Sequence, residues 1–262
     1  MKARKCSSKG SGAGDAWAQF RLGEMCFYVD ENYAKARKLY RKAADQGLAD
    51  AQVQLGYMYE EGLGGPRDYA KALKWYKTAA HRCNVQAQVR LGDIYLLGDG
   101  VTQNYAEAAE WYSNAAYQGL VQAQVQLGYM YLHGKGVTQN YAEALRWYRK
   151  AADQGLADAQ VRLGDMYLHG DGVTQNYAEA LKWYRKAAYQ GDLQAQNRLS
   201  VIYETGLGVT QNYVRAYKWI SLAASADSDE FAKFRDNLAK LMNPEQIAEG
   251  QRLALSWKPK IK

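Results

Sequence analysis

Tyrosine, arginine, aspartate and histidine recur in this chain at matching positions, and these side chains suit recognition chemistry. The pattern Arg-x-x-Asp at Arg90 returns at Arg162, and His133 and His169 stand 36 residues apart (169 minus 133). Adjacent helical repeats lie roughly 10 Å apart, whereas zinc holds each histidine nitrogen at about 2 Å. Tyrosine and arginine are enriched at binding hot spots. The spacing therefore favours partner binding and argues against a shared metal ion.

The segments that carry these side chains repeat with a fixed period. The dipeptide Leu-Gly begins at Leu22, Leu55, Leu91, Leu127 and Leu163, with Leu199-Ser200 as a degenerate sixth copy. Tryptophan keeps a step of 36 residues through Trp75, Trp111, Trp147, Trp183 and Trp219. Such a period is typical of a solenoid, in which each unit packs on its neighbours. The question therefore becomes what the surface binds.

One unit, residues 158–191, shows the expected local structure. Ala159, Leu163 and Tyr167 form one stripe of a short helix, here called the A helix of the unit. Glycines end it, and Asn176 predicts the start of a second helix, the B helix, with Glu179 completing a capping box. Each unit is therefore predicted to be an αα-hairpin.

In its repeated motifs, the chain resembles the Sel1-like repeats, a subgroup of the tetratricopeptide-like solenoids. The matching motifs are A-x-x-x-L-G-x-x-Y (Ala51–Tyr59), G-x-G-V (Gly98–Val101) and A-x-x-W-Y-x-x-A-A-x-x-G (Ala108–Gly119). The resemblance implies an all-α, right-handed αα-superhelix of six repeats. It also implies an adaptor or scaffold role, often in bacterial signalling, the cell envelope or host interaction.

We expect three segments. Residues 1–14 form a flexible basic tail, and residues 225–262 form capping helices and a second basic tail. Phe231, Phe234, Leu238 and Leu241 give one amphipathic stripe of this cap, and Asn243, Pro244 and Gln246 mark the start of another helix. The six repeats between them span 15–47, 48–83, 84–119, 120–155, 156–191 and 192–224.

The predicted binding site is the side of the A helices opposite their inward stripe, which we call the A-helix face. Its positions vary between repeats while the framework does not, and the expected groove is concave. It comprises Arg21, Gln54, Tyr57, Arg90, Asp93, Gln126, Tyr129, His133, Arg162, Asp165, His169 and Arg198. Two alternatives stay open: the Arg-x-x-Asp pairs form simple helix salt bridges, or the alternation reflects a duplicated two-repeat block.

The net charge of +7 comes from the two ends of the chain. Residues 1–14 hold four basic and no acidic side chains, residues 258–262 hold three lysines, and residues 15–257 between them are balanced. Nucleic-acid binding requires a basic stripe on the folded surface, so the balance argues against a nucleic-acid partner. No apolar run reaches the length of a membrane span.

The cysteines do not form a repeat-by-repeat disulfide pattern. Cys6, Cys26 and Cys83 lack the paired arrangement of secreted members of the family, which favours a reducing compartment. The expected location is the cytoplasm for the chain as written. It would be periplasmic or secreted if an export signal is missing. Cys83 occupies a position held by glycine in other repeats and is expected at positive φ.

The motif search favours a protein without catalytic residues, cofactors or metals. A P-loop, His-Glu-x-x-His, Cys-x-x-Cys and Gly-x-Ser-x-Gly are all missing from the sequence. The predicted function is a non-catalytic scaffold or adaptor that binds a protein or peptide partner, with homo-oligomer formation as a variant. The alternative is a cell-envelope enzyme or cell-wall-ligand binder, because a few Sel1-like proteins have such links.

Overall fold

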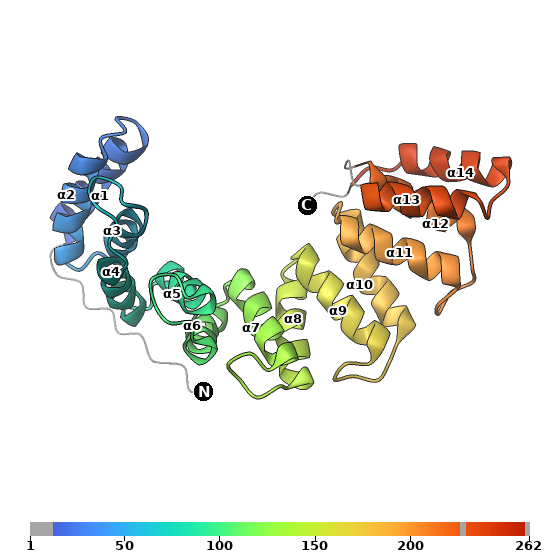
Figure 1. Cartoon of the computed structure of the whole chain (residues 1–262), viewed down its shortest axis with the longest axis horizontal. Coiled ribbons are helices and arrows are strands. Elements are labelled where there is room, and N and C mark those ends of the chain that lie inside the picture. The colour runs from blue at the N-terminus through green and yellow to red at the C-terminus, as the bar shows by residue number, and fades with distance from the viewer. Residues whose placement is uncertain (1–12, 226–228, 260–262) are drawn as a thin grey trace. The chain divides into compact units, whose positions relative to one another are not determined.

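The computed structural model describes residues 13–225 and 229–259, so most of the two predicted basic tails lies outside the described residues. Over the described part, fourteen helices follow one another without a strand (Figure 1). No helix of that part is long and apolar enough to cross a bilayer. The predicted all-α fold class is confirmed.

The A and B helices alternate as the period predicts. The A helices are α1 (Ala13–Tyr28), α3 (Ala49–Glu61), α5 (Val85–Leu97), α7 (Val121–His133), α9 (Ala157–His169) and α11 (Leu193–Thr205). The B helices are α2 (Tyr33–Asp45), α4 (Tyr69–His81), α6 (Tyr105–Tyr117), α8 (Tyr141–Asp153), α10 (Tyr177–Tyr189) and α12 (Tyr213–Ala224). The C-terminal cap contains α13 (Asp229–Ala239) and α14 (Pro244–Leu255).

The chain forms two compact units, residues 1–139 with α1 to α7 and residues 140–262 with α8 to α14. In the first unit, each helix packs on the helices before and after it in sequence. The core is built from fully buried leucines, alanines and tyrosines, among them Tyr40, Leu55, Tyr76 and Leu91. A single hairpin could not bury this apolar surface, which is why the repeats fold on one another.

The repeated Leu-Gly dipeptide allows the two helices of a hairpin to approach closely. A Cβ placed on Gly92 would lie 2.6 Å from Cε1 of Tyr112, and one on Gly56 would lie 2.7 Å from Cε1 of Tyr76. In the sixth repeat, where Ser200 replaces the glycine, the partner position holds Ile220 instead of tyrosine, and both residues are fully buried. In these repeats, glycine therefore occupies the A-helix position where the B-helix partner is a bulky tyrosine.

The predicted N-caps are present. The side chain of Asn176 accepts a hydrogen bond from the backbone N–H of Glu179 at 3.0 Å. The Glu179 carboxylate, however, pairs with Lys182 at 3.3 Å instead of completing a reciprocal capping box. The full box is formed at α14, where Asn243 and Gln246 bond each other's backbone N–H groups.

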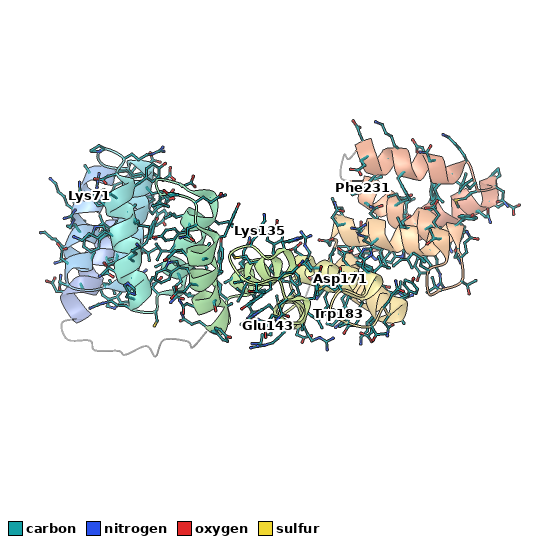
Figure 2. All side chains as sticks on the ribbon, turned by 60° about the horizontal axis from the view of Figure 1, so that its bottom comes forward. Lys71, Lys135, Glu143, Asp171, Trp183 and Phe231 are labelled. Carbon is teal, nitrogen blue, oxygen red and sulfur yellow. The ribbon has the colours of Figure 1, made fainter. Side chains whose placement is uncertain are left out.

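In the second unit, α13 and α14 both pack on α12 and close the last repeat. Phe231, labelled in Figure 2, and Leu238 are buried in the same core as Ile220. Leu241 does not belong to the predicted stripe: α13 ends at Ala239, so this side chain lies beyond the helix and is 59% exposed. The two helices predicted for the cap are confirmed.

Among the residues that the structure describes, two other than glycine have a left-handed backbone. Cys83 has φ of 62°, as its glycine-like position predicts, and Glu31 has φ of 50°. Glu31 lies in the short connection between α1 and α2, where the glycine loop of the other repeats is missing. Both residues adopt the conformation that glycine would accommodate with less strain.

Candidate partner-binding face of the A helices

All the residues predicted for the A-helix face lie on A helices, but the two units hold them separately. The first unit carries those from α1, α3, α5 and α7, and the second carries those from α9 and α11. Gln54 and Gln126 are half-buried on α3 and α7. The face is therefore described within each unit.

The two aspartates of the face have an internal role that the sequence did not reveal. Asp93 accepts a hydrogen bond from the Tyr112 hydroxyl at 2.6 Å, and Asp165 accepts one from the Tyr184 hydroxyl at 2.6 Å. Burial, together with the adjacent carboxylate, raises the pKa of Tyr112 and Tyr184 well above its ordinary value. Both aspartates therefore hold core tyrosines in place, and a contact with a partner remains a prediction.

In the second repeat, a different residue accepts the hydrogen bond from the hydroxyl of the core tyrosine. Its face position holds Tyr57, and the Tyr76 hydroxyl donates instead to Glu60 at 2.6 Å. Burial of the ring raises the pKa of Tyr76 most, the Glu60 carboxylate adds to this, and Arg90 opposes it. Sequence comparison of the repeats missed Glu60 because the acceptor moves to another position on the helix.

Among the residues that the structure describes, neither Arg-x-x-Asp motif forms the salt bridge that was left open as an alternative. Arg162 pairs with Asp158 at 3.4 Å, and Asp165 is bound by Arg198 of the next repeat at 3.2 Å. Arg21 does make a pair within its helix, with Glu24 at 2.9 Å. Of the pairs left open as an alternative, the one between Arg162 and Asp165 is therefore not formed, because Arg198 of the next A helix pairs with Asp165 instead.

Aromatic and cationic side chains meet at the C-terminal end of α7. The rings of Tyr129 and His133 lie 4.3 Å apart, and the Nζ of Lys135 donates to the Tyr129 hydroxyl at 3.0 Å. This hydrogen bond raises the pKa of Lys135. Tyr57 on α3 is half-buried, with its ring 6.4 Å from that of Phe27. Lys135 belongs to this cluster but lies in the loop, outside the helical positions compared in the sequence.

The histidines occupy helix ends. His133 and His169 are the last residues of α7 and α9, and both are exposed. Within the described part of the chain, no group of three or more histidine, cysteine or acidic residues is arranged to hold a metal ion. The histidines can therefore serve as polar contacts on the surface.

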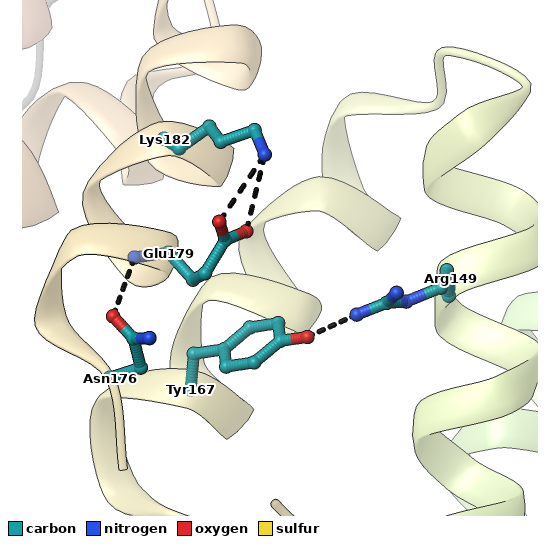
Figure 3. Close-up of polar contacts among 5 residues, drawn as sticks. All are labelled: Arg149, Tyr167, Asn176, Glu179 and Lys182. Carbon is teal, nitrogen blue, oxygen red and sulfur yellow. Dashed lines mark hydrogen bonds and ion pairs between the residues drawn. The ribbon is translucent and has the colours of Figure 1, made fainter. Parts of the chain in front are cut away.

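A second set of tyrosines links neighbouring repeats. An arginine on a B helix donates to a tyrosine on the next A helix, as Arg149 does to Tyr167 (Figure 3). The same bond joins Arg185 to Tyr203 at 2.5 Å, and Arg41 to Tyr59. In each case the acceptor is the hydroxyl group of a tyrosine that we predicted on the inward stripe of an A helix.

Buried glutamines fix the junctions between repeats. The amide of Gln52 donates to the carbonyl of Ala44 at 3.1 Å, at the end of the preceding B helix. Gln88, Gln124, Gln160 and Gln196 make the equivalent bond in the later repeats. The last carbonyls of a helix have no hydrogen-bond partner within the helix, and these glutamines supply one. These invariant framework positions contrast with the variable A-helix face.

Comparison with known proteins identifies the repeats directly. The family model described as Sel1 repeat matches residues 18–48, 49–82, 85–120, 121–156, 157–192 and 193–228. These matches cover most of the chain and number six, as the sequence period predicts. No match was found among curated proteins.

Two solved structures resemble the chain closely in sequence and fold. One is c5321, a protective antigen of uropathogenic Escherichia coli strains with an SLR fold, at 37% identity and a TM-score of 0.80. The match covers 92% of this chain and 53% of that one, so the chain spans about half the length of that protein. The other is a Sel1 repeat protein from Oxalobacter formigenes, at 34% identity, with a TM-score of 0.67 and coverage of 83% and 91%.

Proposed function

Since the chain belongs to the Sel1 repeat family, we propose that it is a non-catalytic scaffold or adaptor that binds a peptide or protein partner on its A-helix face. Proteins built from these repeats generally mediate protein–protein interaction. The observation that carries the proposal is the contrast between invariant buried positions and variable surface positions on the same A helices. In solenoids, such extended surfaces are the usual binding site.

The first unit offers the best-supported part of this face. Tyr57 and Tyr129 present half-buried rings, His133 adds an exposed ring beside Tyr129, and Arg90 is exposed on the helix between them. Tyrosine and arginine are enriched at the hot spots of protein interfaces, and a rigid tyrosine ring buries a large area with little loss of entropy. Asp93 is less suited, because Tyr112 already uses it.

The alternative function, a cell-envelope enzyme or cell-wall-ligand binder, has less support. The two aspartates of the A-helix face already hold core tyrosines of the B helices, Asp93 with Tyr112 and Asp165 with Tyr184. A nucleophile needs an adjacent base oriented by a third group, and these tyrosines are protonated donors to carboxylates. Their arrangement therefore favours a binding role.

The proposal is tested by affinity capture from the native lysate. The intact chain is compared with the variant Tyr57→Ala/Arg90→Ala/Tyr129→Ala, and the captured protein is then purified and its affinity measured. The matched control is Arg146→Ala/Lys182→Ala/Tyr189→Ala on B helices. We expect the partner to be lost from the first variant and retained by the control.

Loss of the partner from the control alone would move the site to the B helices and contradict the proposal. Equal capture by all three proteins would do the same. If the captured protein is a second copy of the chain, the scaffold acts as a homo-oligomer.

A further inference from the structure

The B helices of the first two repeats carry an unusual concentration of lysine. Within α2 and α4, Lys35, Lys38, Lys42, Lys71 and Lys74 are all exposed, and we call them the lysine surface (Figure 2 labels Lys71). The only acidic side chain within either helix is Asp45, at the end of α2. The balanced charge of residues 15–257 conceals this, since acidic residues gather elsewhere, as Asp50, Glu60 and Glu61 do on α3.

Arginine side chains connect α2 to α4 and to the loop between the repeats, and the lysines lie on the exposed side of each helix. The Arg41 guanidinium of α2 lies 5.6 Å from the centre of the Trp75 ring of α4. Arg82, at the end of α4, donates to the backbone carbonyl of Gly47, which follows α2. Lys35 and Lys71 occupy equivalent positions one repeat apart, as do Lys38 and Lys74. The spacing is about one helix-packing distance across the helices.

Most of this charge has no counter-charge. Lys71 pairs with Asp68 at 2.7 Å. In the part of the chain that the structure describes, no carboxylate lies within ion-pairing distance of Lys35, Lys38, Lys42 or Lys74. Like charges held this close repel one another and raise the local potential. An anionic partner would relieve that repulsion.

Two of the lysines, Lys35 and Lys71, also replace a residue that would suit the helix better. Later repeats hold Glu107, Glu143 and Glu179 where α2 and α4 hold lysine, and these glutamates lie in the first helical turn. A negative charge there is favoured by the helix dipole, and a positive charge is disfavoured. A departure from local stability without a structural gain is typical of a functional site.

We propose that the lysine surface is a second docking site, separate from the A-helix face, and that its occupant is an acidic, Asp/Glu-rich segment of a protein partner. The arginines nearby are already engaged, because Arg37 lies 3.8 Å from the centre of the Tyr59 ring and Arg41 donates to the Tyr59 hydroxyl. The lysines therefore provide separate point charges, which suit carboxylates spaced along an extended chain.

Other anionic partners fit this surface less well. Single-stranded nucleic acid needs open aromatic rings for base stacking, but Tyr59 is buried and Arg41 lies over Trp75. Membrane-surface binding relies on apolar side chains that enter the lipid. Of the residues in α2 and α4, all of which the structure describes, none is a strongly exposed large apolar side chain.

The test measures binding of a fluorescein-labelled oligoglutamate peptide by anisotropy at low ionic strength, with duplex DNA and phosphatidylserine-containing vesicles compared under the same conditions. The full chain should bind the peptide more tightly than either competitor, and added salt should weaken the binding. The variant Lys35→Glu/Lys38→Glu gives α2 the side chains that α6 carries at Glu107 and Glu110. We expect its affinity to fall about tenfold or more.

The matched control, Lys182→Glu/Lys186→Glu on α10, changes the charge equally on another B helix and should leave the affinity within about twofold. The melting temperature of the α2 variant should be unchanged or higher, since glutamate suits the first turn of a helix. No binding of the peptide, equal loss in the control, or tighter binding of DNA or vesicles would each overturn the proposal. None of these outcomes depends on the A-helix face.

Discussion

At the scale of single residues, the Gly–Tyr contact leaves no room for a larger side chain at the glycine position. The Tyr112 ring occupies the space that a side chain on Gly92 would need. In the sixth repeat, serine and isoleucine replace the pair together, and Ser200 Oγ uses the freed space to donate to the carbonyl of Ala216 at 2.8 Å. The two positions are thus energetically coupled through their contact.

We predict that Gly92→Ala destabilises the protein by about 1–3 kcal/mol, because the new methyl group overpacks the Tyr112 ring. Urea unfolding of the full chain measures the change. In the sixth repeat, Ile220→Tyr alone should be similarly harmful, and adding Ser200→Gly should restore much of the loss. Equal stability of Gly92→Ala and the wild type would refute the close-contact account.

The hydrogen bond between Tyr112 and Asp93 gives a second prediction at this scale. Asp93→Ala leaves a buried hydroxyl without its acceptor, which costs about 1–3 kcal/mol. Tyr112→Phe in the same chain removes that hydroxyl, so the double variant should lose less stability than the two single variants combined. Chemical denaturation of all four proteins measures the coupling, and additive losses would show that the bond has no role in folding.

At the scale of elements, the C-terminal helices protect the last repeat. Gly250 of α14 packs on Tyr217 of α12, and Phe231 of α13 joins the core of the second unit. An uncovered terminal repeat exposes the apolar side that would contact a neighbour. The cap is therefore expected to support folding of the second unit.

Deleting residues 225–262 should lower the melting temperature sharply, because the apolar surface of α12 becomes exposed to water. Circular dichroism during heating measures the shift. The matched control removes residues 260–262 only and should leave melting unchanged. A truncated chain that melts at the wild-type temperature would rule out the capping role.

The repeat period predicts most elements but not their polar partners. A helix boundary depends on local signals, so Asn176 and Gly170 sufficed to place the ends of two helices. The acceptor of a buried tyrosine depends instead on the three-dimensional neighbourhood, and it changes from Glu60 to Asp93 between adjacent repeats. Likewise, the pairing of Arg198 with Asp165 joins two repeats, which comparison of aligned positions cannot show.

At the scale of the whole molecule, the buried tyrosines set an alkaline limit to stability. Burial raises the pKa of Tyr76, Tyr112 and Tyr184 above the ordinary value of 10.0. The unfolded chain therefore loses these protons at a lower pH than the folded chain does. The stability they contribute is fully present below about pH 10 and is lost as the pH rises above it.

We accordingly predict that titration of these tyrosines leaves the free energy of unfolding constant near neutral pH and lowers it above about pH 10. Urea unfolding at stepped pH values measures it, with tyrosinate absorbance reporting ionisation. Tyr112→Phe should reduce the alkaline loss. If Tyr112→Phe removed tyrosinate absorbance near pH 10, Tyr112 would ionise in the folded protein at the ordinary pKa of tyrosine, and the burial account would be contradicted.

The most direct test of the proposed binding face is hydroxyl-radical footprinting of the chain with its captured partner. Oxidation of each side chain is compared in the free and bound protein. The account predicts protection of Tyr57, Tyr129 and His133 on the A helices, while Tyr141 and Tyr189 on the B helices of the second unit keep their reactivity. Protection of Tyr141 and Tyr189 with unchanged Tyr57, Tyr129 and His133 would contradict it.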